Sequence, residues 1–140
     1  MSENYKIIAK FIKDMSSETT DTETYIFVKE NIFKYQLGIN INSKPLKNQV
    51  IEINTNLKFE DKEDNKMKSF FEISYITIIK VNEQIKDKNI LQKIVLCDVQ
   101  KDIYKELEKS MLNLLHNSGY PAITFEKKID FDELYKKNFS

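Results

Sequence analysis

Hydrophobic and polar residues alternate along several stretches of the chain, and a period of two is typical of a β-strand with one buried face. The clearest stretch covers residues 33–42, where one face carries only Phe33, Tyr35, Leu37, Ile39 and Ile41. Residues 51–60 alternate in the same way, and residues 5–13 do so less regularly. Residues 67–81 form a further apolar run. Four strands are therefore predicted, with the polar residues 16–23 as a loop after the first of them.

The last predicted strand is apolar on both faces. One face carries Phe71, Ile73, Tyr75, Ile79 and Val81, and the other carries Phe70, Ile76 and Ile78 among Glu72, Ser74 and Lys80. A strand that is apolar on both faces is normally covered on both faces. A single helix covers one face, so the other needs a partner subunit, a bound polypeptide or the short C-terminal helix, and we favour an oligomer interface or a client surface.

The hydrophobic period changes after residue 82. Apolar residues then recur every three or four positions, at Leu96, Val99, Ile103, Leu107, Met111 and Leu114. This spacing predicts an amphipathic helix that Asp98 or Asp102 caps and that ends before Gly119. An extended segment with Pro121 follows, and Asp130 is placed to cap a short helix over residues 131–139. The order of elements predicts one α+β domain over residues 1–140: a four-stranded antiparallel sheet, a long helix, an extended loop and a short C-terminal helix.

Composition narrows the functional classes. The 140 residues hold 22 basic and 22 acidic side chains, so the formal net charge is zero and gives no global attraction to nucleic acid or anionic membranes. A near-zero charge gives little protection from self-association, which favours an oligomer. The chain has no signal-peptide pattern and no apolar run long enough to span a membrane, so we expect a cytoplasmic protein without membrane insertion.

The residue types that carry catalysis or bind metals are sparse. The single cysteine, Cys97, is expected to be a small buried hydrophobe, and the single histidine, His116, has no second histidine with which to share a metal. The acidic residues Asp14, Glu18, Asp21 and Glu23 fall in a polar segment. Such a segment does not provide the desolvated site that acid–base catalysis requires, and it suits docking of a basic partner better. We therefore expect no enzymatic activity, no metal and no cofactor.

Two stretches resemble the SecB family of protein-export chaperones. Residues 120–135 contain Tyr-Pro, then Ile-Asp-Phe-Asp-Glu-Leu-Tyr, which is similar to the loop and helix start that close the SecB domain. Residues 11–18, Phe-Ile-Lys-Asp-Met-Ser-Ser-Glu, resemble the family's motif at the end of its first strand. The predicted order of elements agrees with this family over nearly the whole chain. The chain ends at Ser140 without the acidic tail of many members, so it resembles a divergent, tail-less member.

The resemblance implies an ATP-independent holdase that forms a homotetramer, a dimer of dimers. Such chaperones hold unfolded precursor proteins in hydrophobic grooves, keep them competent for translocation by the Sec pathway and pass them to the SecA motor. Carried over by position, the candidate client-binding residues are Phe27, Tyr35, Phe70, Tyr120, Pro121 and Ile123. The candidate motor-docking acids are Asp14, Glu18 and Glu72. Residues 120–128 would be a lid over the groove, which the short helix holds in place.

Two other functions fit the same residues. The first is a SecB-like chaperone dedicated to one partner, for example an antitoxin. The second is a carrier that uses the apolar sheet face as a pocket for a small ligand. A general holdase binds many unfolded chains and ignores their folded forms, whereas a dedicated chaperone binds one partner and a carrier copurifies with an apolar molecule.

Overall fold

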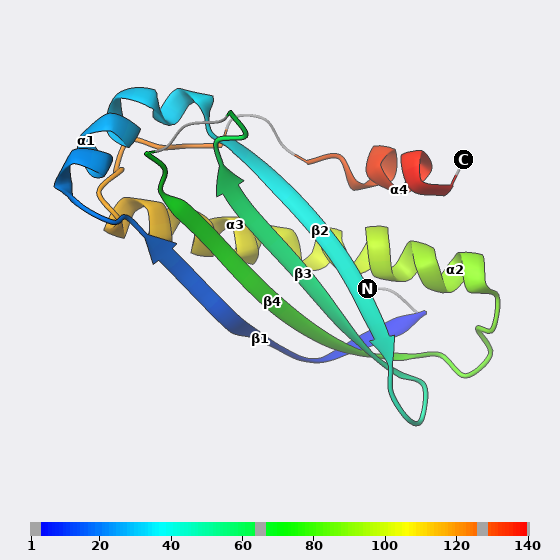
Figure 1. Cartoon of the computed structure of the whole chain (residues 1–140). Helices are drawn as coiled ribbons and strands as arrows, with labels where there is room; N and C mark the ends of the chain where they lie inside the picture. The colour runs from blue at the N-terminus through cyan, green and yellow to red at the C-terminus, as the bar shows by residue number, and fades with distance from the viewer. Residues whose placement is uncertain (1–3, 64–66, 126–128, 140) are drawn as a thin grey trace.

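The computed structural model describes residues 4–63, 67–125 and 129–139, with side chains as far as residue 137. Four antiparallel strands form one twisted sheet in the order β1-β4-β3-β2 (Figure 1). Their bounds are β1 (Tyr5–Glu18), β2 (Gln36–Pro45), β3 (Val50–Glu60) and β4 (Phe70–Val81). The α+β fold predicted from the alternating pattern is confirmed. Strands β1 and β2 form the two edges of the sheet, and each has one side free of strand partners in the described part of the chain.

The segment between β1 and β2 was predicted wrongly. Residues 16–18 continue β1, and a helix, α1 (Thr22–Asn31), begins before the expected loop ends. Asp21 caps α1, because its carboxylate accepts a hydrogen bond from the Thr24 backbone N–H at 2.8 Å. Only Thr24 and Val28 of α1 are buried, so its apolar stripe is too narrow to register as a helical pattern.

Two strands also begin later than predicted. A 3-10 turn, η1 (Ile32–Lys34), precedes β2, so Phe33 and Tyr35 lie before the strand rather than in it. Strand β4 starts at Phe70, not at residue 67. Before β2 the alternation continues beyond the strand because Phe33 and Tyr35 of the preceding turn line the groove described below.

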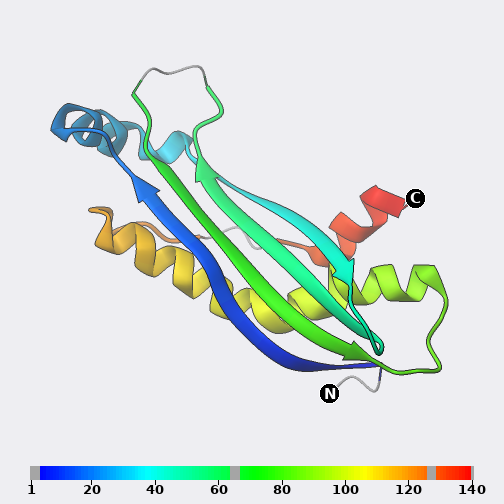
Figure 2. The same cartoon turned by 60° about the horizontal axis from the view of Figure 1, so that its bottom comes forward.

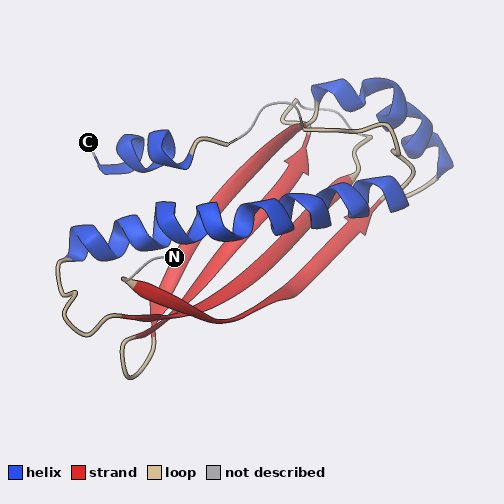
Figure 3. Ribbon diagram, turned by 180° about the vertical axis from the view of Figure 1, so that it is seen from behind, coloured by secondary structure: helices blue, strands red, loops and turns tan. Residues whose placement is uncertain are grey.

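One long helix crosses the inner face of the sheet (Figure 3). It comprises α2 (Lys88–Lys93), a π-helical turn η2 (Ile94–Asp98) and α3 (Val99–Asn117). The helix thus begins well before the predicted start. Asp87 caps it by accepting from the Asn89 N–H at 2.8 Å, whereas Asp98 lies within the helix and Asp102 accepts a hydrogen bond from the Tyr5 hydroxyl. None of the described helices is long and apolar enough to cross a membrane.

A buried polar contact joins the sheet to the π-helical turn. Gln100 is fully buried; its Oε1 accepts from the Thr55 hydroxyl at 3.0 Å, and its Nε2 donates to the Val95 carbonyl at 3.1 Å. A π-helical turn displaces the regular i to i−4 pairing, and the glutamine amide gives the Val95 carbonyl a partner. The contact therefore ties the π-helical turn to strand β3.

The two faces of the sheet differ in burial. The inner face carries the core side chains that pack on the helix, among them Ile53, Leu57, Ile73 and Ile79, all 0 % exposed. On the outer face of β4, Ile76 is only 3 % exposed, because it lies between Phe11 of β1 and Asn54 of β3. Ile76 thus needs no partner molecule, whereas Phe70 on the same face is 53 % exposed.

Candidate functional site: a groove beside the edge strand β2

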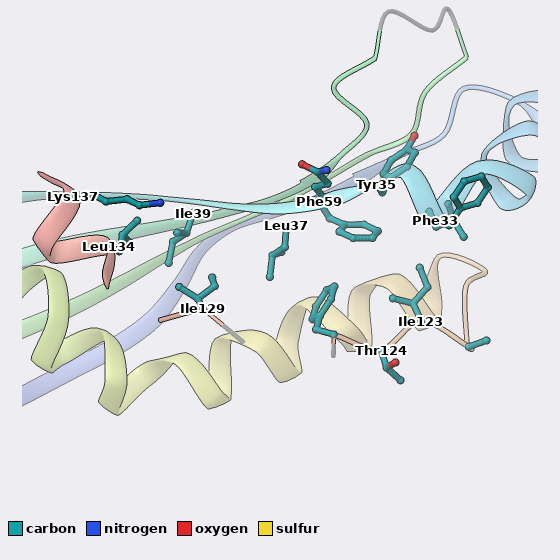
Figure 4. Close-up of a pocket in the computed structure, with 14 residues that line it drawn as sticks. Phe33, Tyr35, Leu37, Ile39, Phe59, Ile123, Thr124, Ile129, Leu134 and Lys137 are labelled. Carbon is teal, nitrogen blue, oxygen red and sulfur yellow. The ribbon is translucent and has the colours of Figure 1, made fainter. Parts of the chain in front are cut away.

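A groove of about 910 Å³ runs between β2 and the chain that follows the long helix (Figure 4). Figure 4 shows Leu37, Ile39 and Phe59 on the sheet side, with Ile129 and Leu134 toward the end nearer the C-terminal helix and Phe33, Ile123 and Thr124 toward the other. The walls are almost entirely apolar. Its described lining residues are Ile32, Phe33, Tyr35, Gln36, Leu37, Ile39, Phe59, Ala122, Ile123, Thr124, Phe125, Ile129, Leu134 and Lys137. Lys137 is the one charged residue among them.

One wall of the groove is the extended segment after α3, residues 120–125, which we call the lid. The lid is attached at both ends of its described part. At the start, Gly119 has a φ of 105°, its carbonyl accepts from the Tyr25 hydroxyl at 2.7 Å, and the Tyr25 and Tyr120 rings lie 5.3 Å apart. Further along, His116 Nε2 donates to the Ile123 carbonyl at 3.0 Å. The predicted lid residues 126–128 lie outside the described residues.

An aromatic cluster connects the lid to the sheet. The Phe125 ring lies 5.6 Å from the Phe59 ring, edge to face, and Phe59 in turn lies 5.5 Å from Tyr35. Tyr35 is 7 % exposed, its hydroxyl accepts from the Ser69 backbone N–H at 3.0 Å, and its burial raises the pKa of the phenol. The tyrosine therefore stays neutral, and the groove presents rings rather than charge to a bound molecule.

The far end of the groove is closed by α4 (Phe131–Phe139). Asp130 caps this helix, as predicted, through a 3.1 Å bond from the Glu133 N–H, and Phe131 packs on Tyr104 with ring centres 5.3 Å apart. Asp132 accepts from Lys101 Nζ at 2.8 Å and from the Cys97 thiol at 3.1 Å. The short helix is thus held on the long helix by one buried ring and one carboxylate.

Strand β2 also offers its backbone to the groove. Backbone N–H and C=O groups of successive residues in an antiparallel strand point alternately toward the paired strand and away from it. The Leu46 N–H donates to the Val50 carbonyl at 2.7 Å, so Leu46 and Val50 form a hydrogen-bonded pair. Because this direction alternates along the strand, the backbone groups of the even-numbered residues of β2 form hydrogen bonds with β3. The backbone groups of Leu37, Ile39 and Ile41 therefore point to the free edge of the sheet. These residues also place their side chains on the inner face.

The structure brings together only part of the candidate client-binding set. Tyr35 and Ile123 line the groove. Tyr120 is buried in the core, 3 % exposed, where its ring supports the lid from behind at 5.8 Å from Phe71. Three residues lie away from the groove lining: Phe27 is on α1, Phe70 is on the outer face of the sheet, and Pro121 is exposed on the lid.

Several lining residues were missed at the level of sequence. Leu37 and Ile39 share the inner face of β2, and the alternating pattern already places them together. Phe125 lies within the lid expected over residues 120–128, but Ile129 and Leu134 were not assigned to the groove, because only the return of the chain across the helix brings them opposite β2.

The three candidate motor-docking acids gather on the outer face, away from the groove. In the β1–β4 register Asp14 pairs with Ser74, Ser16 with Glu72, and Glu18 with Phe70. Cross-strand partners share a face, so Asp14, Glu18 and Glu72 occupy three successive rows at the same end of the sheet. Asn56 donates to Glu72 at 2.8 Å, and the exposed Phe70 ring lies in the row of Glu18.

The described lining of the groove contains no His, Cys, Asp or Glu side chain. In the described part of the chain, no group of three or more His, Cys, Asp or Glu side chains is placed to hold a metal ion. Cys97 is fully buried, and its burial raises the pKa of the thiol to about 11, so it lacks the thiolate character of a nucleophile. An apolar groove beside free backbone groups can bind an extended polypeptide.

Comparison with known proteins agrees with this geometry. The whole chain, residues 1–140, matches the family described as "Preprotein translocase subunit SecB". The chain is 60 % identical over 137 residues to the "Putative protein-export protein SecB" of Pelagibacter ubique (strain HTCC1062), and the match covers 98 % of each chain. Among solved structures, the fold is similar to a SecB-like chaperone of Mycobacterium tuberculosis in complex with a ChAD peptide from an antitoxin. That match has a TM-score of 0.58 and 8 % identity, and it covers 89 % of this chain and 91 % of the other.

The last similarity concerns the fold alone, because the identity is low. The family match and the close relative carry more weight, since both extend over essentially the whole chain. The family is one of chaperones rather than enzymes. With its four-stranded sheet, long helix and lid, this chain belongs to the SecB family and is a SecB-type chaperone.

Proposed function

We infer that the chain is a cytoplasmic, ATP-independent holdase whose groove beside β2 binds unfolded precursor polypeptides and keeps them competent for export. The observation that carries this proposal is the coincidence of two features on one strand. Leu37 and Ile39 line the apolar groove with their side chains and direct their backbone groups to the open edge. A folded protein has its own backbone groups paired and its apolar side chains buried, so it fits neither feature.

Binding in this groove would be tolerant of sequence. A client segment would contact rings and aliphatic side chains from the sheet, the lid and α4, while its backbone adds a strand to β2. Aromatic walls give large contact areas without fixed hydrogen-bond geometry, which suits clients of varied sequence. The peptide complex of the M. tuberculosis SecB-like chaperone is consistent with polypeptide binding by this fold.

A matched pair of variants on adjacent residues tests the proposal. Ile39 lines the groove, whereas Asn40, the next residue of β2, faces the outer side of the sheet. We expect Ile39→Asp to weaken binding of a reduced, unfolded polypeptide by more than about tenfold, since burial of a charge in an apolar groove is unfavourable. Asn40→Asp adds the same charge and should leave binding unchanged.

The readout is light scattering on a sizing column, with the protein alone, with the unfolded polypeptide and with the same polypeptide folded. Growth of the complex only with the unfolded form supports a holdase. Equal binding of both forms, or equal effects of the two variants, would contradict the proposed site. Tight binding of one polypeptide and indifference to others would instead indicate a chaperone dedicated to a single partner, and a copurifying apolar molecule would indicate a carrier.

We further propose that the chain assembles as a homotetramer, a dimer of dimers, with the edge strand β1 forming one of its two kinds of interface. This edge exposes four large apolar side chains: Ile8, Phe11, Ile12 and Met15, between 41 % and 53 % exposed. A long apolar edge strand invites pairing with another strand, and pairing with a second copy would cover it. Ile12→Lys should therefore lower the mass by light scattering, whereas Ile26→Lys on α1, at a side chain 52 % exposed, should not.

The acidic rows of the outer face are the proposed docking site for the SecA motor. Asp14, Glu18 and Glu72 lie at one end of the sheet, on the face opposite the helix, so a motor bound there would leave the groove open. Neutralising Asp14 and Glu18 should weaken binding of purified SecA, and neutralising Glu23 and Glu30 on α1, which removes the same number of charges, should have a smaller effect. Equal effects of both changes would indicate general attraction rather than docking at these rows.

A further inference from the structure

Lysines outnumber acids at one end of the sheet, although each end also holds an opposite-charge pair, Lys44 opposite Glu52 and Lys58 opposite Glu72. At one end of the sheet, Lys80 of β4 lies between Lys6 of β1 and Val50 of β3. Val50 in turn pairs with Leu46 at the tip of the β2–β3 hairpin. At the other end, the rows contain the acids that we assign to motor docking. The formal net charge of the whole chain is zero, but one end of the molecule carries more lysines and the other carries more acids.

The basic end extends beyond the sheet. Figures 1 and 2 show the hairpin tip, the start of β1 and the loop before α2 gathered at one end of the molecule. Residues 4–6, 44–52 and 80–90 of this end hold six lysines and three acids. The lysines are Lys6, Lys44, Lys47, Lys80, Lys86 and Lys88. None of them forms an ion pair within the described part of the chain.

Two like charges of the basic end lie side by side, whereas Lys44 lies opposite Glu52. Lys6 and Lys80 are direct cross-strand partners, an arrangement that destabilises a sheet unless an anion lies nearby. The turn beside them is held in place, because the Gln49 carbonyl accepts from the Val81 N–H at 2.9 Å and the Val50 N–H donates to the Lys47 carbonyl at 3.3 Å. The lysines are therefore displayed on a formed structure.

Apolar side chains project among these lysines. Leu46, at the hairpin tip, is 42 % exposed between Lys44 and Lys47, and Ile90, in the first turn of α2, is 44 % exposed between Lys88 and Lys93. Exposed apolar side chains flanked by lysine are typical of surfaces that bind at a membrane interface.

The chemistry of the cations favours a lipid surface over an acidic protein. All 22 basic residues of the chain are lysines, and none is arginine. Arginine forms the planar, two-bonded pairs with which proteins recognise carboxylates at fixed positions, whereas lysine is a flexible point charge that suits a diffuse negative potential. A projecting tip with one exposed leucine also fits a deformable interface better than a rigid surface.

We propose that this basic end binds the surface of an anionic phospholipid bilayer, with Leu46 entering the interface and Lys44, Lys47 and Lys80 near the head groups. The contact is separate from the client groove and from the acidic docking rows. It holds the chaperone at a membrane without a spanning segment and leaves the acidic end directed away from the lipid.

Flotation of the full chain with lipid vesicles tests the proposal. We expect cosedimentation or flotation with vesicles of phosphatidylcholine and phosphatidylglycerol, none with phosphatidylcholine alone, and loss of binding in high salt because screening weakens each contact. Lys44→Glu/Lys47→Glu/Lys80→Glu should lower the partition coefficient by more than about tenfold. Lys58→Glu/Lys62→Glu/Lys68→Glu makes the same change in net charge at the other end and should lower it much less.

Two further measurements separate the alternatives. Leu46→Ser should weaken vesicle binding several-fold without affecting attraction to soluble polyglutamate. The proposal would be overturned if the chain did not bind anionic vesicles, or if both triple variants lost vesicle binding equally. It would also be overturned if the chain bound polyglutamate more tightly than vesicles and Leu46→Ser had no effect on vesicle binding. Thermal unfolding confirms that each variant is folded. The Ile39→Asp variant should bind vesicles normally, so failure of the holdase function and failure of membrane binding are told apart.

Discussion

Replacement of Gly119 by alanine should destabilise the chaperone strongly, because the residue joins α3 to the lid in a conformation that suits glycine alone. Its φ is 105°, and an added Cβ would lie 2.5 Å from Tyr25 Cε1 and 2.9 Å from the Tyr25 hydroxyl. The unfavourable backbone angle costs about 1–2 kcal/mol. If the Tyr25 ring moves away, its hydrogen bond to the Gly119 carbonyl is lost, about 0.5–1.5 kcal/mol, as is part of its ring contact with Tyr120. Together these effects predict a loss of about 2–4 kcal/mol of unfolding free energy.

The chain provides a matched control. Gly38 is the other glycine, and a Cβ there would meet only the Lys58 carbonyl, at 4.0 Å. Glycine in a strand interior is less favourable than alanine, so Gly38→Ala should be neutral or stabilise by up to about 1 kcal/mol. Urea unfolding at one fixed protein concentration measures both changes, because assembly would otherwise shift the midpoint.

The double variant Gly119→Ala/Tyr25→Ala separates the backbone cost from the clash. Removal of the ring gives the new Cβ room, so the two substitutions together should cost less than the sum of their separate costs. Gly119→Ala should also weaken client binding, since the lid begins at this residue. A loss of stability no greater than that of Gly38→Ala, or strictly additive costs in the double variant, would refute the reasoning.

Three further predictions concern the long helix and its contacts. Thr55→Val should lower stability by about 1–2 kcal/mol in urea unfolding, because it leaves the buried Gln100 oxygen without its donor; a neutral effect would contradict the assigned pair. Burial raises the pKa of Cys97 from 9.0 to about 11, so alkylation followed by mass spectrometry should be at least about a hundredfold slower in the folded than in the unfolded protein near pH 8; equal rates would contradict its burial. Hydrogen bonds from Lys101, and then from the Cys97 thiol, hold the pKa of Asp132 below its ordinary value. The ionised Asp132 therefore stabilises the folded protein at any pH above the pKa that this carboxyl has in the unfolded chain. The stabilisation is lost as the pH falls through the lower pKa of Asp132 in the folded protein. Asp132→Asn should therefore lower stability at neutral pH and not in acid, and a constant difference across pH would exclude this cause.

The strands that alternate in sequence were predictable, and those boundaries that failed did so for physical reasons. Strand β2 and strand β3 present a clean period of two, because one face packs on the helix and the other meets solvent. Helix α1 was missed because it buries only Thr24 and Val28, and so few buried positions give no helical period. The start of α2 was missed because none of its residues is buried, which leaves only the Asp87 cap as a signal.

The sheet side of the groove was predictable from the sequence pattern, whereas the lid over residues 120–128 was expected only from the resemblance to the SecB family. The sheet wall of the groove follows from the alternation around Leu37 and Ile39. The opposite wall depends on how the chain turns at Gly119 and where Phe125 meets Phe59, and neither contact leaves a local pattern in the sequence. Phe70 was a candidate client-binding residue because it is aromatic, but its exposed ring lies on the outer face of the sheet, away from the groove.

Site-specific photocrosslinking can show whether unfolded clients occupy the groove beside β2. A photoreactive side chain placed at residue 39 lies in the groove, and one placed at residue 40 lies on the outer face of the same strand. With a reduced, unfolded polypeptide, we expect strong crosslinking from residue 39, little from residue 40 and none from either when the polypeptide is folded. Equal crosslinking from both residues, or more from residue 40, would contradict this expectation.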